Sequence, residues 1–147
     1  FWRHYMPLSR SEIMSRIRGK RTKPELALFA AAGAAGLWFR RWCRAHPGTP
    51  DLCLHRERVA VFASSCFWHR CPRHYRPPRM NAAWWDAKTL ANARRDRRAA
   101  RRLRAAGFRA LTWMGHESLG RFMRRLSRAV RAGGARGAAG AGGARTT

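Results

Sequence analysis

Acidic residues are scarce in this chain of 147 residues, which has 7 Asp and Glu against 32 Lys and Arg, a formal net charge of +25. A compact protein with this charge repels itself unless anions neutralise it, which favours a polyanionic partner such as nucleic acid. Lysine is also rare, occurring only at Lys20, Lys23 and Lys88. A GC-rich genome would account for Arg in place of Lys, but it would not account for the shortage of acids.

Long apolar runs are absent as well. No stretch approaches the roughly 18 residues that a membrane-spanning helix needs, and the first residues do not resemble a signal peptide. We therefore expect a cytoplasmic protein without membrane contact. The length suits one domain with a hydrophobic core, assigned to residues 1–130. From residue 131 onward Gly and Ala dominate, so residues 131–147 are expected to be a disordered tail.

Apolar periodicity and turn residues predict a mixed α/β fold. Thr22-Lys-Pro-Glu25 has the spacing of a capping box, with a proline in the first turn, and indicates a helix start. The expected helices cover residues 9–18, 22–35, 84–106 and 117–130. The expected strands cover residues 37–43, 51–54, 59–63 and 108–113.

The residues with the most distinctive chemistry lie in one short stretch. Cys66, His69, Cys71 and His74 occur within nine positions, just after an apolar run. Closely spaced Cys and His residues are typical ligands of Zn²⁺. The four cysteines of the chain could instead form two disulfides, but a reducing compartment favours metal binding by Cys66 and Cys71.

Two aromatic residues, Phe67 and Trp68, lie between the candidate metal ligands. A rigid loop would turn them outward, and exposed aromatics in a basic protein indicate stacking on nucleic-acid bases. Cys43 and Cys53 lie in apolar segments and are expected to be buried as small hydrophobic residues.

Four motifs occur in a fixed order over about residues 9–130. They are Ile13-Met-Ser-Arg-Ile-Arg-Gly-Lys-Arg-Thr-Lys-Pro-Glu25, Pro47-Gly-Thr-Pro-Asp51, Cys66-Phe-Trp-His69 with Cys71-Pro72 and His74, and Asn92-Ala-Arg-Arg-Asp-Arg-Arg98. In order and spacing they resemble the very-short-patch repair (Vsr) endonucleases. The resemblance implies a PD-(D/E)xK nuclease fold of the restriction-endonuclease type, with a mixed central sheet flanked by helices. It also implies nicking of double-stranded DNA 5′ to the thymine of a T·G mismatch, as arises when 5-methylcytosine deaminates.

The resemblance assigns roles to the candidate catalytic residues. Asp51 corresponds to a ligand of catalytic Mg²⁺, with the backbone carbonyl of Ala63 beside it, although Asp51 alone would pass for a turn residue. His69 corresponds to the general base, although it is also a further candidate for the metal. Glu25 corresponds to the carboxylate that orients this histidine, unless it stays in the helix cap. Asp96 corresponds to an aspartate that organises metal-bound water, while its charge alone would offset neighbouring arginines.

The resemblance also implies a structural Zn²⁺ site formed by Cys66, Cys71, His74 and His116. Many relatives use cysteine at the position of His116, which alone would pass for a surface histidine. Ser64 departs from the family, whose members commonly carry Asp or His with Gly just before the Cys-Phe-Trp-His run. This serine is a poor substitute for a group that positions water.

For DNA, the resemblance implies an aromatic wedge that enters the duplex beside the mismatch and a side chain that enters from the minor groove. The wedge residues are Phe67, Trp68 and Trp85, and the minor-groove residue is Met14. Trp38, Trp42 and Trp84 have no counterpart and are expected to be in the core or partly buried.

The sequence therefore predicts a monomeric, Mg²⁺-dependent DNA mismatch endonuclease with a structural zinc. One alternative is a related nuclease of the same fold that acts on another DNA substrate. The other is a zinc-containing DNA-binding module whose active site has decayed, and Ser64 is the residue that favours it. The bases recognised beside the mismatch and any repair-protein partner do not follow from the sequence.

Overall fold

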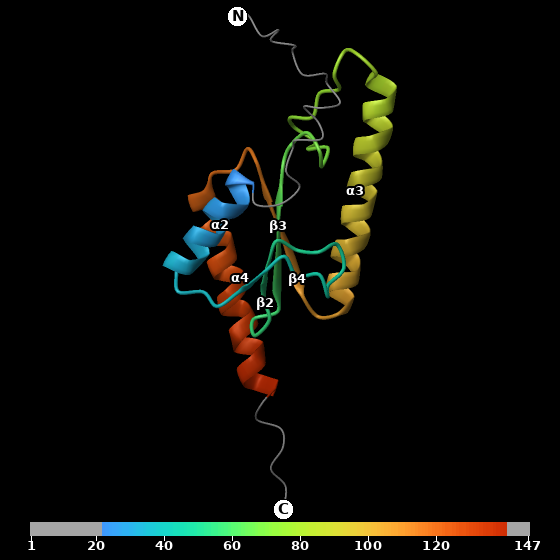
Figure 1. The fold of residues 1–147 in the computed structure, drawn as a ribbon. Helices are drawn as coiled ribbons and strands as arrows, with labels where there is room; N and C mark the ends of the chain where they lie inside the picture. Colours follow the sequence, from blue (N-terminus) through green and yellow to red (C-terminus); the bar gives the residue numbers. More distant parts are fainter. Residues whose placement is uncertain (1–21, 141–147) are drawn as a thin grey trace, which may run out of the picture.

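The computed structural model describes residues 22–140, with side chains described up to residue 134. The elements follow in the order α2 (Lys23–Ala34), β1 (Arg40–Arg41), β2 (Leu52–Leu54), β3 (Val59–Ser64), α3 (Ala82–Ala105), β4 (Arg109–Met114) and α4 (Leu119–Gly140). The sheet lies between α2 and α4 on one face and α3 on the other (Figure 1). The predicted mixed sheet flanked by helices is confirmed. The expected helix over residues 9–18 and Met14 lie outside the described residues.

The sheet has the order β1-β2-β3-β4. The first three strands pair antiparallel, and β4 pairs parallel to β3. A parallel pair needs a long crossover connection, which α3 provides. The expected strand over residues 37–43 is wrong in extent, because only Arg40–Arg41 pairs with β2. Gly36 and Trp42 both have positive φ angles, +71° and +46°, so the chain bends on either side of this short strand.

The three helices start close to where the sequence predicts them. The predicted capping box at the start of α2 is wrong, because the Thr22 side chain makes no hydrogen bond to a backbone N–H of the first turn. Its hydroxyl instead donates to Glu25 Oε1 at 2.9 Å. The expected end of the last helix near Val130 is also wrong, because α4 continues to Gly140. The alanines that interrupt the glycines there have the highest helix propensity of any residue.

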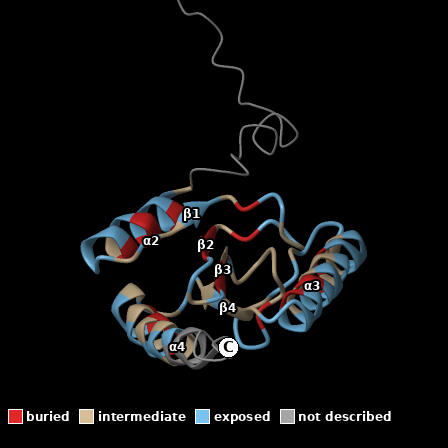
Figure 2. Ribbon diagram, turned by 90° about the horizontal axis from the view of Figure 1, so that it is seen from below, coloured by how far each residue is buried: buried red, intermediate tan, exposed pale blue. Residues whose placement is uncertain are grey.

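The core consists of two apolar clusters, one on each face of the sheet. Residues of β3 alternate between them: Val59 and Val61 face the cluster under α2 and α4, whereas Ala60 faces the cluster under α3. Cys43 and Cys53 belong to the second cluster and are buried, as predicted. The buried residues of the helices face the sheet and the outer faces are exposed (Figure 2).

Gly133 of α4 packs directly on the turn between β2 and β3. A Cβ atom at this position would lie 2.1 Å from the backbone oxygen of Glu57. We therefore expect Gly133→Ala to lower the free energy of unfolding by about 1–3 kcal/mol, because backbone cannot move aside cheaply. Gly134→Ala is the matched control, since nothing lies within 4 Å of its Cβ position. It should stabilise the helix by up to about 1 kcal/mol, and urea unfolding of both variants would show the difference.

Candidate active site and metal centre

A cavity of about 770 Å³ opens at the edge of the sheet where β3 and β4 end. In parallel α/β sheets, ligands bind outside the carboxyl ends of the strands. The cavity walls come from the start of α2, the end of β3 and the loop that follows it, which lie on the same upper side in Figure 1. Four of the sequence-predicted residues line it: Glu25, Ala63, Trp68 and His69. Ser64, which departs from the family pattern, lines it too.

Asp51 lies next to this cavity, held against β3 by two hydrogen bonds. Its N–H donates to Val61 O at 2.9 Å, and its Oδ2 accepts from the N–H of Ala63 at 2.7 Å. Burial raises the pKa of the Asp51 carboxyl to about 6, against the effect of the Ala63 N–H, and the negative charge of Glu25 adds to the rise. Such a carboxylate is stabilised by a cation, so the donor set fits a hard ion such as Mg²⁺.

Glu25 is buried in the first turn of α2, with 6% of its surface exposed. Its carboxylate accepts from the Thr22 hydroxyl at 2.9 Å and from Trp42 Nε1 at 3.0 Å. Trp42 is itself fixed by an edge-on contact with Phe29, with ring centroids 5.5 Å apart. These contacts hold the Glu25 carboxylate close to Asp51, where its negative charge raises the pKa of the Asp51 carboxyl.

His69 is paired with Asp96 of α3, its Nδ1 lying 2.5 Å from Asp96 Oδ2. The two side chains are partly exposed, at 29% and 40%, and both also line a smaller cavity of about 240 Å³. The resemblance implies that Glu25 orients this histidine. In the structure the Asp96 carboxylate also lies at hydrogen-bonding distance from the ring. Asp96 also lies 4.0 Å from Arg95 Nε, so the charge-offsetting contact considered for it exists beside the pairing.

The predicted zinc ligands come together at one point. Ligand atoms of Cys66, Cys71, His74 and His116 all lie within 4.8 Å of one another. His116 Nδ1 is 3.2 Å from Cys66 Sγ and 3.6 Å from Cys71 Sγ, and His74 Nδ1 is 3.6 Å from Cys71 Sγ. Tetrahedral zinc with usual bond lengths separates a sulfur and a nitrogen ligand by about 3.6 Å, so these residues fit the ion. His69 is not one of them.

The electrostatics of the cluster favour a thiolate at Cys71. Burial raises the pKa of this thiol, but hydrogen bonds from His74 and neighbouring backbone outweigh that and lower it to about 7. Burial and the neighbouring Cys71 raise the pKa of Cys66. Since a metal binds the thiolate, Cys71 is the cysteine better prepared to bind one.

An aromatic cluster stands between the cavity and the start of α3. The rings of Phe67, Trp68 and Trp85 contact one another edge-on, with centroids 5.3 to 5.6 Å apart. Trp84 packs edge-on against Trp85 at 4.7 Å and is 57% exposed. The expectation that Trp84 is in the core or partly buried is therefore wrong, because the first turn of α3 presents it to solvent.

Trp38 and Trp42 were also expected to be in the core or partly buried. This expectation is wrong for Trp38, which follows the end of α2 and is 83% exposed. It is confirmed for Trp42, which is partly buried against Phe29.

The contacts that hold the aromatic cluster of Phe67, Trp68 and Trp85 were not predicted from the sequence. Asp86 accepts hydrogen bonds from Arg70 and from the Tyr75 hydroxyl, each at 2.9 Å. Asn92 of α3 donates to the backbone oxygen of Trp68 at 3.1 Å. Asp86 is one of two acids in α3, the other being Asp96, and the sequence pattern does not single it out as an acceptor.

The rest of α3 presents a basic surface beside the cavity. Seven of its arginines are exposed, namely Arg94, Arg95, Arg97, Arg98, Arg101, Arg102 and Arg104. Among residues 22–140, no helix is both long and apolar enough to cross a membrane.

Comparison with known proteins agrees with this geometry. Residues 3–74 match the family described as DNA mismatch endonuclease Vsr. The chain is 39% identical over 115 residues to the type II nicking enzyme V.NaeI of Lentzea aerocolonigenes, an alignment covering 75% of this chain and 69% of that protein. It is 36% identical over 110 residues to the type II nicking enzyme V.XorIIP of Xanthomonas oryzae, covering 73% and 80%. It is 33% identical over 104 residues to the DNA mismatch endonuclease Vsr of Escherichia coli, covering 70% and 67%.

Proposed function

This chain belongs to the Vsr family of DNA mismatch endonucleases, and we propose that it nicks one strand of duplex DNA 5′ to the thymine of a T·G mismatch. The observation that carries the proposal is the His69–Asp96 pair. His69 lines the cavity, and a partly buried carboxylate, Asp51, lies beside it. This combination supplies a general base and a cation site at one place. A partly buried aromatic cluster and a basic helix flank it.

In this proposal His69 removes the proton from the attacking water. With Nδ1–H donated to Asp96, the lone pair of Nε2 is free to accept that proton. The Asp96 carboxylate then stabilises the imidazolium that forms, as the aspartate does in other histidine-based catalytic groups. Asp96 is thus proposed to orient the histidine, in addition to the water-organising role that the resemblance implies.

Mg²⁺ is the proposed catalytic ion, bound by Asp51 together with the backbone carbonyl of Ala63. When bound, it would stabilise the charge that develops on the phosphate oxygens. Glu25 adds a second fixed negative charge near Asp51, which favours a divalent cation over a monovalent one. Zinc is proposed to bind the separate Cys₂His₂ cluster in a structural role, since four protein ligands leave no open position.

A nicking assay with synthetic duplexes tests the proposal. We expect Mg²⁺-dependent cleavage of one strand, 5′ to the thymine, in a duplex with a single T·G pair, and none in the matched T·A duplex. Leaving Mg²⁺ out of the buffer should abolish the nick without removing DNA binding, because the basic surface does not depend on that ion. Tight binding of the mismatch without cleavage in Mg²⁺ or Mn²⁺ would instead indicate the decayed binding module.

Trp68 is expected to provide preference for mismatched DNA. Stacking on one base contributes about 1–3 kcal/mol, and unstacking costs less at a mismatch. Trp68→Ala should therefore weaken binding of the T·G duplex about 10-fold or more and leave the matched duplex almost unchanged. Trp38→Ala is the control, since Trp38 is exposed but outside the aromatic cluster. Equal weakening of both duplexes in a titration would rule out the wedge.

A further inference from the structure

The outer face of α2 is apolar and open to solvent. Leu26 is 46% exposed, and Ala30 and Ala34 on the same side are exposed too. No charged residue occurs from residue 26 to residue 39, in a chain whose residues are 27% charged. If this face of α2 were only solvated, a protein this basic would be expected to carry arginine on it. Its apolar character indicates that the face packs against a partner.

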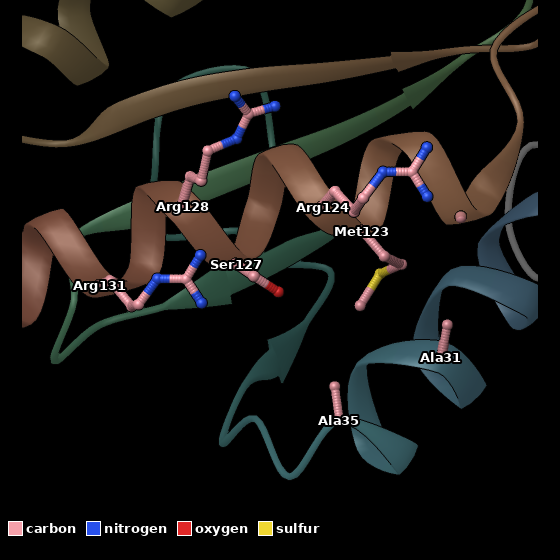
Figure 3. Close-up of a pocket in the computed structure, with 8 residues that line it drawn as sticks. Ala31, Ala35, Met123, Arg124, Ser127, Arg128 and Arg131 are labelled. Atoms are coloured by element: carbon pink, nitrogen blue, oxygen red, sulfur yellow. The ribbon is translucent and has the colours of Figure 1, made fainter.

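Beside this face, a groove of about 560 Å³ separates α2 from α4. Met123 of α4 points toward α2, and the methyl groups of Ala31 and Ala35 point toward α4 (Figure 3). Ser127 continues the same side of α4. Side chains this small leave room for a third helix to lie close to both backbones.

Three arginines, Arg124, Arg128 and Arg131, line the α4 side of the groove. Their spacing of four and three residues places them along one side of the helix, over about 10 Å of rise. Arg125 of α4 forms an ion pair with Glu117. Among residues 22–140, none of these three arginines forms an ion pair. The groove therefore combines an apolar floor with uncompensated positive charge.

These features select one kind of occupant. DNA phosphates would pair with the arginines but would leave the apolar floor of Ala31, Ala35 and Met123 uncovered. A second copy of this chain would bring the same excess of positive charge. We propose that the groove between α2 and α4 binds an acidic amphipathic helix of a partner protein, with carboxylates facing the three arginines and aliphatic side chains over Met123 and the alanines.

Docking at this groove leaves the proposed nicking site accessible. Ala31 follows Glu25 by six residues, about 9 Å of helix rise, and the groove continues away from the cavity. A partner bound there and DNA bound at the cavity can therefore occupy the protein together. The proposal stands on this surface alone and does not depend on which mismatch is cut.

The test uses a synthetic probe, a fluorescent helical peptide of about five turns. It carries leucines on one face and glutamates spaced to meet the arginines, and a control peptide carries glutamine in place of glutamate. The full chain should bind the glutamate peptide in fluorescence anisotropy at physiological salt. The Arg124→Gln/Arg128→Gln/Arg131→Gln variant should bind it about 10-fold more weakly.

Two further variants separate docking from general charge attraction. Arg94→Gln/Arg98→Gln/Arg101→Gln removes the same charge from α3 and should retain peptide binding. Ala35→Arg fills the groove floor while adding a positive charge, and it should weaken peptide binding although the net charge rises. All variants should melt as the parent does, because the substituted side chains are exposed or partly exposed.

Three results would overturn the proposal. One is equal weakening of peptide binding by the α3 and α4 triple variants, and another is tighter binding by Ala35→Arg. The third is a loss of duplex affinity in the α4 triple variant as large as in the α3 triple variant, which would make the groove a DNA contact.

Discussion

His69→Ala is expected to lower the rate of nicking by about 10²–10⁴-fold, the usual contribution of a general base. The rate should be measured in single-turnover conditions on a T·G duplex, so that product release does not hide the chemical step. Duplex affinity should change little, because the proposal assigns His69 to the reacting water and the arginines to the phosphates. A His69→Ala protein that nicks at nearly the parent rate would remove this residue from the mechanism.

The Asp96 side of the pair gives a sharper version of the same test. Asp96→Asn keeps the size of the side chain but removes the charge that would stabilise an imidazolium, so nicking should again fall strongly. Single-turnover nicking of the T·G duplex measures this fall. Lys88→Gln is the control on the same helix, since Lys88 is exposed and lies outside both the His69–Asp96 pair and the arginine surface.

The secondary structure was predictable where side-chain patterns decide it. The core strand β3 has a continuous apolar run, and α3 is long and ends before Gly107, so both were found within two residues. The exceptions have local backbone causes. The positive φ of Trp42 shortens β1, and the alanines after Val130 extend α4 past the expected boundary. Apolar periodicity does not report either effect.

The parts of the candidate site that lie close together in the sequence were predictable from residue types, and the distant parts were not. Cys66, Cys71 and His74 are neighbours, and their residue types alone indicated a metal. The pairing of His69 with Asp96 spans 27 residues, and that of Cys71 with His116 spans 45. Only packing of α3 and β4 against the loop brings such residues together, so the sequence could suggest them only through family resemblance. Nothing in the pattern pointed to the acceptor role of Asp86.

Loss of the metal cluster is expected to have the largest effect on the folded state. Structural zinc contributes about 10–16 kcal/mol in small zinc-binding peptides, which equals or exceeds the whole stability of a typical domain. The purified chain should contain about one zinc ion. Cys71→Ser should lose it and unfold or aggregate, because Cys71 is buried at 2% exposure and contacts both histidines of the cluster.

Two comparisons isolate the metal from the cost of changing a buried cysteine. Cys43→Ser alters another buried cysteine, outside the cluster, and should retain zinc while losing only the stability expected of a polar group in the core. His116→Cys should also retain zinc, since thiolate and imidazole both satisfy the tetrahedral ion, whereas His116→Ala should lose it. Zinc content by mass spectrometry, with melting before and after chelation, measures these differences. A metal-free parent that melts unchanged would contradict the structural role, because the loop carrying His69 and Trp68 would then hold its shape without the ion.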